Sequence, residues 1–509
     1  MSSIAKALYR ARHSFPGGSA IRPRHRIAAF ATALLLVTPA HAAKPTAEAA
    51  AAPSDAGPTA TAPTLTDTYR EAAERLISAA LASDNAYTRL SQLCDGIGNR
   101  LSGSESLERA VRWAAGAMRA DGLENVRLQP VMVPHWVRGQ ESAVMLEPGP
   151  QKLVILGLGR SVGTPPGGVT ADVVVVGSFD ELAALPADAV RGKIVLYDVP
   201  YTKYGETVRY RGEGANRAAA RGAVAALVRS VTLASLRLAH TGAMSAYVDS
   251  IPKIPAAAVT IEDATMIHRL VARGERVRVR LEMEANTLPD VQSANVIGEL
   301  RGRERPEEVV ALGGHIDSWD VGQGAHDDGG GCVVAMEALR LMKQLGMRPR
   351  RSVRVVLWVN EENGLKGGRA YRDSLGDDVK NHVAAIESDG GVERPEGFGV
   401  TVAIAKGDTV AGRARQQRAM ERVRQIAALL AGIGASDVTD EGGGADISPL
   451  MRAGVPGLAE RTTMEHYFDW HHTQADTFDK VDPQELRKNV AAMAVMAYVL
   501  ADMPGRVGD

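Results

Sequence analysis

Residues 309–331 read VVALGGHIDSWDVGQGAHDDGGG, and this stretch decides the fold. Its first four residues, Val309 to Leu312, form an apolar run that predicts a buried strand. Two glycines then interrupt the run before His315, and three more precede an apolar run with helical spacing, Cys332 to Leu345. This order of strand, polar loop and helix is typical of sheets that present ligands at the carboxyl ends of their strands.

The alternation of strand and helix continues to the end of the chain. Apolar strands are expected at Val353 to Val359 and at Val383 to Ile386, and Asp482-Pro483 begins a last helix that is apolar enough to be buried. We therefore expect an α/β fold, a doubly wound, mixed, mostly parallel sheet with helices on both faces. We assign this domain to residues 67–138 and 289–509.

Residues 139–288 interrupt that domain. They contain short β-branched runs, an alanine-rich helical run and many Gly and Pro turns, but no cluster of residues suited to catalysis. We expect a β-rich inserted domain.

The amino-terminal 42 residues have six basic residues and no acid, then an apolar run, then Ala40-His41-Ala42. This order predicts a signal peptide, and the run is too short for the ~20 residues of a membrane helix. Residues 43–66, rich in Ala, Pro and Thr, are expected to form a flexible leader. The mature protein would then be exported to the periplasm or secreted.

Charge and cysteine content narrow the classes of function. Loss of the six basic residues takes the formal charge from -1 to -7, which disfavours nucleic acid as a partner. The chain has two cysteines, Cys94 and Cys332, which lie in different contexts and are expected to be buried free thiols.

Five segments carry polar residues that could bind metal. Four lie at the end of a strand or the start of a helix, and the fifth, Asp469 to Thr477, is a polar loop with a histidine pair. Each has an ordinary explanation, because acids cap helices, paired glutamates form solvated turns and a histidine after a strand is often a loop residue. Together they supply histidine and carboxylate ligands, which suit zinc better than Mg²⁺ or Ca²⁺, although cobalt or manganese would fit too. The candidates are His315, Asp327, Glu361, Glu362, Asp389, His471 and His472, with Asp317 placed to orient the His315 imidazole.

The spacing of these motifs resembles the co-catalytic di-zinc exopeptidases typified by bacterial leucyl aminopeptidases. The motifs are His-x-Asp-Ser, Asp-Asp-Gly-Gly-Gly, Glu-Glu, Asp-Gly and His-Thr-x-x-Asp-Thr. The His-His form of the last motif is similar to the carboxypeptidase Q branch, whereas several aminopeptidases have a tyrosine where His471 stands. Segments 191–196 and 254–257 look like a protease-associated inserted domain.

The resemblance implies a role for each candidate. Asp327 would bridge two zinc ions, with His315 and Asp389 completing one site and Glu362 and His472 the other. Glu361 would be the general base that takes the proton of the attacking water. The resemblance also implies a cis peptide between Asp327 and Asp328 and a substrate-facing loop at 442–447, which makes Asp446 a candidate substrate contact.

The expected function is hydrolysis of short peptides that have a free amino terminus, by a dipeptidase or an aminopeptidase. Two alternatives stay open: acyl transfer with one zinc, as in glutaminyl cyclases, or a non-catalytic receptor-like domain that has lost its metals. The expected partner is a peptide substrate, no membrane anchor is expected after signal cleavage, and a homodimer is left open.

Overall fold

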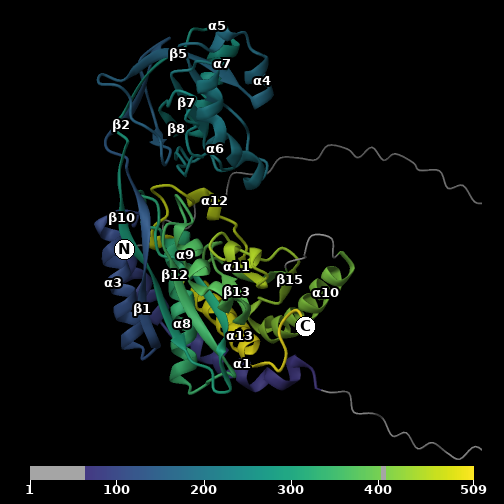
Figure 1. Cartoon of the computed structure of the whole chain (residues 1–509). Coiled ribbons are helices and arrows are strands. Elements are labelled where there is room, and N and C mark those ends of the chain that lie inside the picture. The colour runs from purple at the N-terminus through teal and green to yellow at the C-terminus, as the bar shows by residue number, and fades with distance from the viewer. Residues whose placement is uncertain (1–62, 403–408) are drawn as a thin grey trace, which may run out of the picture. The chain divides into compact units, whose positions relative to one another are not determined.

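The computed structural model describes residues 63–402 and 409–509 as a mixed α/β fold (Figure 1). The predicted signal peptide and most of the predicted leader lie outside the described residues. The described chain begins with α1, which starts at Leu65, two residues before the boundary expected for the catalytic domain. Among the described helices, none combines the length and the apolar character that a membrane span requires.

An eight-stranded mixed sheet forms the centre of the catalytic domain. Its strand order is β1-β10-β12-β11-β13-β16-β14-β15. Neighbours from β12 to β16 run parallel, as do β14 and β15, whereas β1, β10 and β12 pair antiparallel and so do β16 and β14. The strands are β1 Glu124–Val137, β10 Asn286–Leu300, β11 Arg305–His315, β12 Arg351–Trp358, β13 His382–Glu387, β14 Pro395–Thr401, β15 Asp437–Thr439 and β16 Gly457–Thr462.

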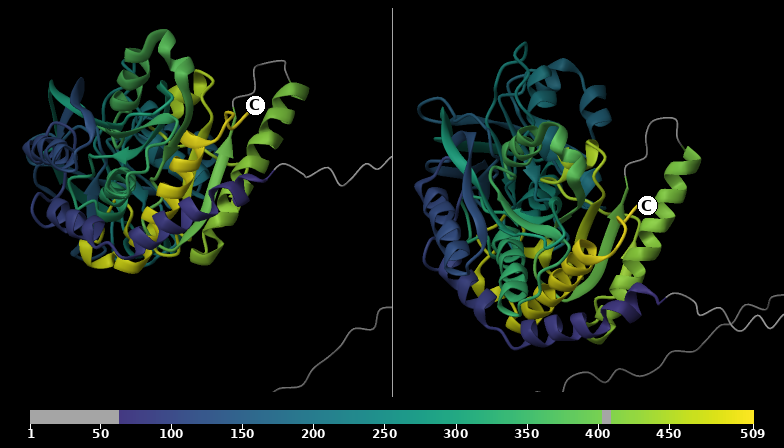
Figure 2. Two further views of the ribbon diagram at one scale, coloured as in Figure 1. Left: turned by 90° about the horizontal axis from the view of Figure 1, so that it is seen from below. Right: turned by 60° about the horizontal axis from the view of Figure 1, so that its bottom comes forward.

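Helices cover both faces of this sheet, because alternate residues of each strand point to opposite sides. On β12, Val355 and Leu357 join the large core, whereas Val356 and Trp358 join a smaller core on the other face. The large core is covered by α1 Leu65–Leu81, α2 Asn85–Cys94, α3 Glu105–Ala120, α8 Gly330–Gln344, α10 Thr409–Ala427 and α13 Pro483–Asp502, and the smaller by α9 Lys366–Leu375 and α11 Ser448–Arg452. In both views of Figure 2, α1 lies across the ends of α8 and α13.

Helix α8 is the helix predicted from the apolar run Cys332 to Leu345, and its start explains the run of glycines. The Asp328 carboxylate lies between two of them and accepts hydrogen bonds from His315 N at 2.9 Å and Gly331 N at 3.0 Å. A Cβ atom at Gly314 would lie 2.0 Å from Asp328 Oδ2, and one at Gly331 would lie 2.5 Å from Asp328 Oδ1. Only glycine therefore lets the end of β11 and the start of α8 pack against this carboxylate.

The inserted segment forms a second eight-stranded sheet, in the order β3-β2-β9-β5-β6-β7-β8-β4. It also carries four helices, so the described insertion combines the expected strands with more helix than the one alanine-rich run predicted. Its strands are β2 Glu141–Glu147, β3 Gln151–Leu153, β4 Ile155–Gly157, β5 Val169–Val176, β6 Ile194–Tyr197, β7 Ala225–Arg229, β8 Ala256–Val259 and β9 Arg278–Met283. Its helices are α4 Phe179–Ala184, α5 Ala187–Val190, α6 Tyr204–Ala220 and α7 Ile261–Ala272. The paired ends of β1 and β10 lead into and out of it.

Both cysteines are buried and free, as predicted. Cys332 lies in the first turn of α8, where its Sγ is 3.2 Å from the carbonyl oxygen of His315. Burial raises the pKa of both thiols, so neither is suited to act as a nucleophile.

Candidate functional site

Three of the candidate segments lie at adjacent strand ends. His315 ends β11, the Glu361-Glu362 pair follows β12, and Asp389 follows β13. Because β12, β11 and β13 are parallel neighbours, their carboxyl ends meet at one edge of the sheet. Asp327 reaches the same place from the loop before α8.

His315 and two carboxylates form the first cluster. His315 Nε2 is 3.2 Å from Asp327 Oδ1 and 3.3 Å from Asp389 Oδ1. Burial opposes a charge on His315, but Asp389 and Asp327 together raise the pKa of this imidazole well above its usual range. The negative charge of the two carboxylates therefore favours one cation in this cluster, whether a proton on His315 or a metal ion.

The second cluster shares Asp327. His472 Nε2 is 3.2 Å from Asp327 Oδ2 and 3.1 Å from Glu362 Oε2. Each carboxylate oxygen of Asp327 thus faces a different histidine and a different second acid. The peptide bond between Asp327 and Asp328 is cis, which confirms the arrangement that the resemblance implied.

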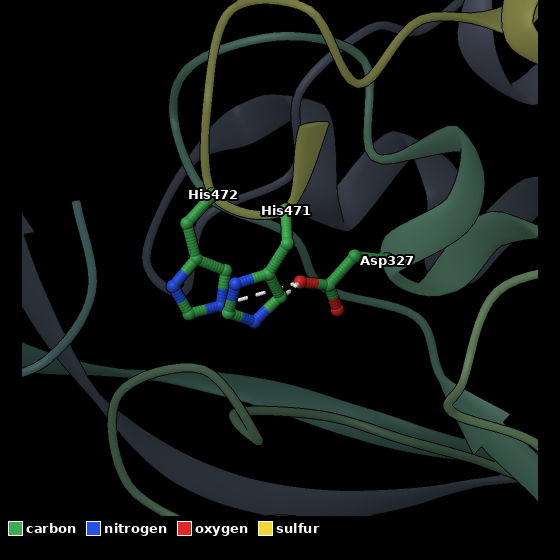
Figure 3. Close-up of side chains that lie close together, drawn as sticks. All are labelled: Asp327, His471 and His472. Carbon is green, nitrogen blue, oxygen red and sulfur yellow. Dashed lines mark ion pairs between the residues drawn. The ribbon is translucent and has the colours of Figure 1, made fainter. Parts of the chain in front are cut away.

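His471 lies beside His472 rather than away from the site (Figure 3). The two rings stack with their centroids 3.6 Å apart, and the Asp327 carboxylate is directed toward both. His471 Nε2 is 3.7 Å from Asp327 Oδ2, and its only ion pair in the described chain is with that carboxylate. His472 forms ion pairs with both Asp327 and Glu362, whereas His471 forms one with Asp327 alone.

The donor set fits a pair of zinc ions. Two histidines and three carboxylates converge on two places that share Asp327, and Glu362 Oε1 is buried without a hydrogen-bond partner in the described part of the chain. A buried carboxylate oxygen without a donor costs free energy unless a cation neutralises it. Nitrogen and oxygen ligands in these numbers are those that zinc prefers.

The two glutamates after β12 have different surroundings. Glu362 is ion-paired with His472, whereas the Glu361 carboxylate lines the pocket and forms no hydrogen bond or ion pair with any described residue. Burial, Asp389 and Glu362 raise the pKa of Glu361 well above its usual range. A carboxylate with a raised pKa that faces the pocket is suited to accept a proton.

Asp317 orients His315, but through its main chain. His315 Nδ1 lies 3.0 Å from the Asp317 carbonyl oxygen, whereas the Asp317 carboxylate is 3.9 Å from the same nitrogen. That carboxylate instead accepts a hydrogen bond from Glu361 N at 3.1 Å. Asp317 therefore holds both the imidazole and the turn that carries the glutamate pair.

Two buried charged residues hold the loop that carries Asp327. The Asp476 carboxylate accepts three main-chain hydrogen bonds, from Ala325 N at 3.1 Å, His326 N at 2.8 Å and Asp327 N at 3.1 Å. The Arg100 guanidinium donates to main-chain carbonyls on both sides of the loop, including Ile316 O at 2.8 Å and Gly324 O at 2.9 Å. Neither contact is visible from spacing alone, although Asp476 belongs to the His-Thr-x-x-Asp motif.

The inserted domain also contacts the site. The main chain of Thr241 donates to His472 O at 3.0 Å, and its carbonyl oxygen lies 3.2 Å from His472 Nδ1. Arg211 Nη1 lies 3.3 Å from the same ring nitrogen and donates to Thr241 O at 3.0 Å. A ring that donates its Nδ1 hydrogen to Thr241 O has Nε2 free to bind a metal.

The clusters open into a pocket of about 540 Å³ that is lined by both domains. Tyr467 lines it and was not singled out from the sequence; its hydroxyl has no hydrogen-bond partner in the described part of the chain. Burial, Asp327 and Asp389 raise the pKa of this phenol, which keeps it protonated. In the loop at 442–447, Ala445 lines the pocket, whereas Asp446 is buried beside Glu387 and is not part of the pocket wall.

Comparisons with known proteins agree with this geometry. The sequence pattern of "Peptidase family M28" matches residues 295–497. Carboxypeptidase Q of Mus musculus is 44% identical over 438 residues, covering 86% of this chain and 90% of that protein. Carboxypeptidase Q of Homo sapiens is 45% identical over 422 residues, covering 83% of this chain and 86% of that protein.

Solved structures give the same result. The crystal structure of a peptidase M28 precursor from Shewanella amazonensis superposes with a TM-score of 0.81 at 34% identity, covering 87% of this chain and 98% of that one. BSAP, a zinc aminopeptidase from Bacillus subtilis, has a TM-score of 0.60 at 22% identity, covering 83% of this chain and 96% of that one, and supports the fold alone.

Proposed function

The chain belongs to peptidase family M28, and from this premise we propose that it is an exported di-zinc exopeptidase that hydrolyses short peptides at a free amino terminus. It is a carboxypeptidase Q-like zinc peptidase. We propose four further points: the number of zinc ions, the roles of single residues, the substrate and the export. The observation that carries it is Asp327, whose two carboxylate oxygens each face a separate histidine and acid.

We assign one zinc ion to His315, Asp389 and Asp327, and the other to His472, Glu362 and Asp327. The chemistry that zinc supplies at such a site is to acidify a water molecule and to polarise the carbonyl of the scissile bond. Among the acids of the site, His471 is ion-paired with Asp327 alone, and we assign it to the support of the His472 ring by stacking.

The residues of the chain carry the proton transfers. Glu361, which faces the pocket without a partner among the described residues, accepts the proton of the attacking water and passes it to the leaving amine. Tyr467 keeps its proton and donates a hydrogen bond from its hydroxyl to the carbonyl oxygen as negative charge develops there. Carboxylates beside the metal clusters would hold the α-ammonium group of the substrate.

The proposed export rests on residues 1–42, whose basic, apolar and small-residue segments have the order of a signal peptide. Amino-terminal sequencing of protein recovered outside the cytoplasm checks it. A mature chain that begins close to Ala43 is expected, and a protein that keeps Met1 in the cytoplasm contradicts export.

Metal analysis and peptide digestion test the function together. We expect about two zinc ions per chain after reconstitution. Asp327→Ala should bind much less zinc, whereas Asp377→Ala, which changes an exposed acid on the same domain, should bind as much zinc as the wild type. The zinc-loaded enzyme is then given a peptide library of which half is N-acetylated, and the products are identified by mass spectrometry.

The outcomes separate the alternatives. Equal cleavage of free and acetylated peptides would exclude recognition of the amino terminus. One zinc ion per chain with release of a cyclised product would instead favour acyl transfer, and a chain that binds no zinc would favour a receptor-like role.

A further inference from the structure

A buried arginine links the two domains close to the candidate metal site. Arg138 lies between β1 and β2, where the chain enters the inserted domain. Its guanidinium group donates two hydrogen bonds to the Asp320 carboxylate, from Nε to Oδ2 at 2.8 Å and from Nη2 to Oδ1 at 2.5 Å. Asp320 belongs to the catalytic domain, in the loop between β11 and the segment that carries Asp327. The pair therefore has the fork-shaped geometry that arginine forms with a carboxylate and lysine cannot.

The same guanidinium group also binds the inserted domain. Arg138 Nη1 donates to Gly157 O in β4 at 2.5 Å and lies 3.5 Å from Glu141 Oε1. Thr241 donates its hydroxyl hydrogen to the same Gly157 oxygen at 2.7 Å. Arg138 and Thr241 thus share one acceptor, and Thr241 is the residue whose main chain contacts His472.

Trp319 gives a second connection from this ion pair to His472. It precedes Asp320 in the chain, and its ring centroid lies 5.6 Å from that of His472 at an interplanar angle of 58°. The indole ring is buried and packs against Gly159 of the inserted domain, where a Cβ atom would lie 2.2 Å from it. Movement of Asp320 would therefore shift the surface on which the His472 ring rests.

The other proposed zinc ion is held within the catalytic domain. His315 ends β11, and its Nδ1 lies 3.0 Å from the Asp317 carbonyl oxygen. Asp389 follows β13, a central strand of the same sheet. Disturbance of the junction between the domains should therefore affect the two zinc ions unequally.

We propose that Arg138 is a positioning residue for His472, which it holds in place through Asp320 and Thr241 without touching metal or substrate. The inference rests on the proposed function, in which His472 binds one of the two zinc ions. A metal ligand has to be held within about 0.5 Å of its productive position by the residues around it. Arg138 fixes groups of both domains at once, and a lysine, with one compact ammonium group, cannot make all of these contacts.

Arg138→Lys should therefore separate the affinities of the two zinc ions. Loss of a group that orients a ligand lowers metal affinity roughly ten- to a hundredfold, and we expect this drop for one ion only. Stepwise competition with a chelator of known affinity measures both dissociation constants, and elemental analysis counts the zinc that remains. Asp320→Asn should give the same pattern, because it breaks the ion pair from the other side.

Arg89→Lys is the matched control. Arg89 and Asp121 form another buried fork-shaped pair, from Nη1 to Oδ2 at 2.7 Å and from Nη2 to Oδ1 at 2.6 Å. This pair joins α2 to the end of α3, and both helices belong to the catalytic domain. Its loss should lower thermal stability and leave both zinc affinities as in the wild type. A general loss of stability therefore cannot imitate the expected result.

Ligand variants identify the zinc ion that Arg138 supports. In His315→Ala the more tightly held ion should be the one at His472, and addition of Arg138→Lys should weaken it roughly tenfold or more. In His472→Ala the remaining ion lies at His315, and addition of Arg138→Lys should leave its affinity unchanged. The reverse pattern would contradict the assignment of Arg138 to His472.

These measurements need no peptide, so the inference and the proposed function can fail separately. A wild type with two zinc ions whose affinities are unchanged in Arg138→Lys, or weakened equally, overturns the inference and leaves the di-zinc peptidase in place. Selective loss of one ion supports the inference even if no peptide is cleaved. A wild type that binds no zinc overturns both.

Discussion

Replacement of Asp476 by asparagine should weaken the metal site although Asp476 is not among the proposed metal ligands. Its Oδ1 accepts hydrogen bonds from Ala325 N and His326 N, and its Oδ2 accepts one from Asp327 N at 3.1 Å. An asparagine can keep its oxygen toward the first two donors. Its amide group then faces the Asp327 N–H, so one charge-assisted bond is lost and a buried donor has no acceptor.

The magnitude follows from those three contacts. A buried donor left without a partner costs about 1–3 kcal/mol, and loss of the negative charge weakens the two remaining bonds, so we expect about 2–4 kcal/mol in total. If the whole cost falls on the conformation that binds metal, zinc affinity drops roughly thirty- to a thousandfold.

Competition with a chelator of known affinity measures the loss, and thermal unfolding with and without zinc shows how much of it falls on folding instead. Asp479→Asn is the control, because Asp479 is exposed and its ion pair with Lys480 is worth at most about 1 kcal/mol. If Asp476→Asn kept both the zinc affinity and the thermal stability of the wild type, this account of the Asp327 loop would be wrong.

Three further substitutions test single groups. Glu361→Gln should keep both zinc ions and lower kcat roughly a hundred- to ten-thousandfold, because the amide cannot accept the proton; loss of zinc would make Glu361 a ligand. Tyr467→Phe should lower kcat on the order of ten- to a hundredfold without a change in thermal stability, and unchanged turnover would exclude the phenol from catalysis. Burial raises the pKa of Glu460 to about 8 from 4.5, so the folded protein keeps a proton that the unfolded chain loses, and stability falls as pH rises between those values. Glu460→Gln should therefore unfold at a higher temperature than the wild type at pH 8.5 but not at pH 4, and an equal difference at both pH values would contradict the assigned pKa.

The strand ends of the catalytic sheet could be predicted from sequence because their signals are local. His315, the glutamates after β12 and Asp389 each follow an apolar run, and parallel neighbours bring such ends together without knowledge of the rest of the chain. The same reasoning gives the buried helix α8 and its glycines. The antiparallel pairing of β1 with β10 has no such local signal, because the inserted domain separates the two strands in the sequence.

The supports of the site could not be predicted, because they join distant residues. Asp476 binds the main chain about 150 positions earlier, and Thr241 reaches His472 from another domain. Tyr467 is an ordinary residue of a short helical segment until the fold places it at the pocket. Of the helices in the insertion, the alanine-rich run predicted α6, whereas α4 and α5 are too short to show a clear apolar periodicity.

The double contact between Thr241 and His472 ties metal affinity to the docking of the inserted domain. Thr241 holds the main chain of His472 through one hydrogen bond and lies against its ring through a second contact, so displacement of the inserted domain would disturb a proposed zinc ligand. Linkage is reciprocal, so zinc bound at His472 must strengthen the hold of the inserted domain by the same free energy. On the proposed assignment the inserted domain is part of the metal site, and its movement away from His472 would break both contacts that hold this ligand.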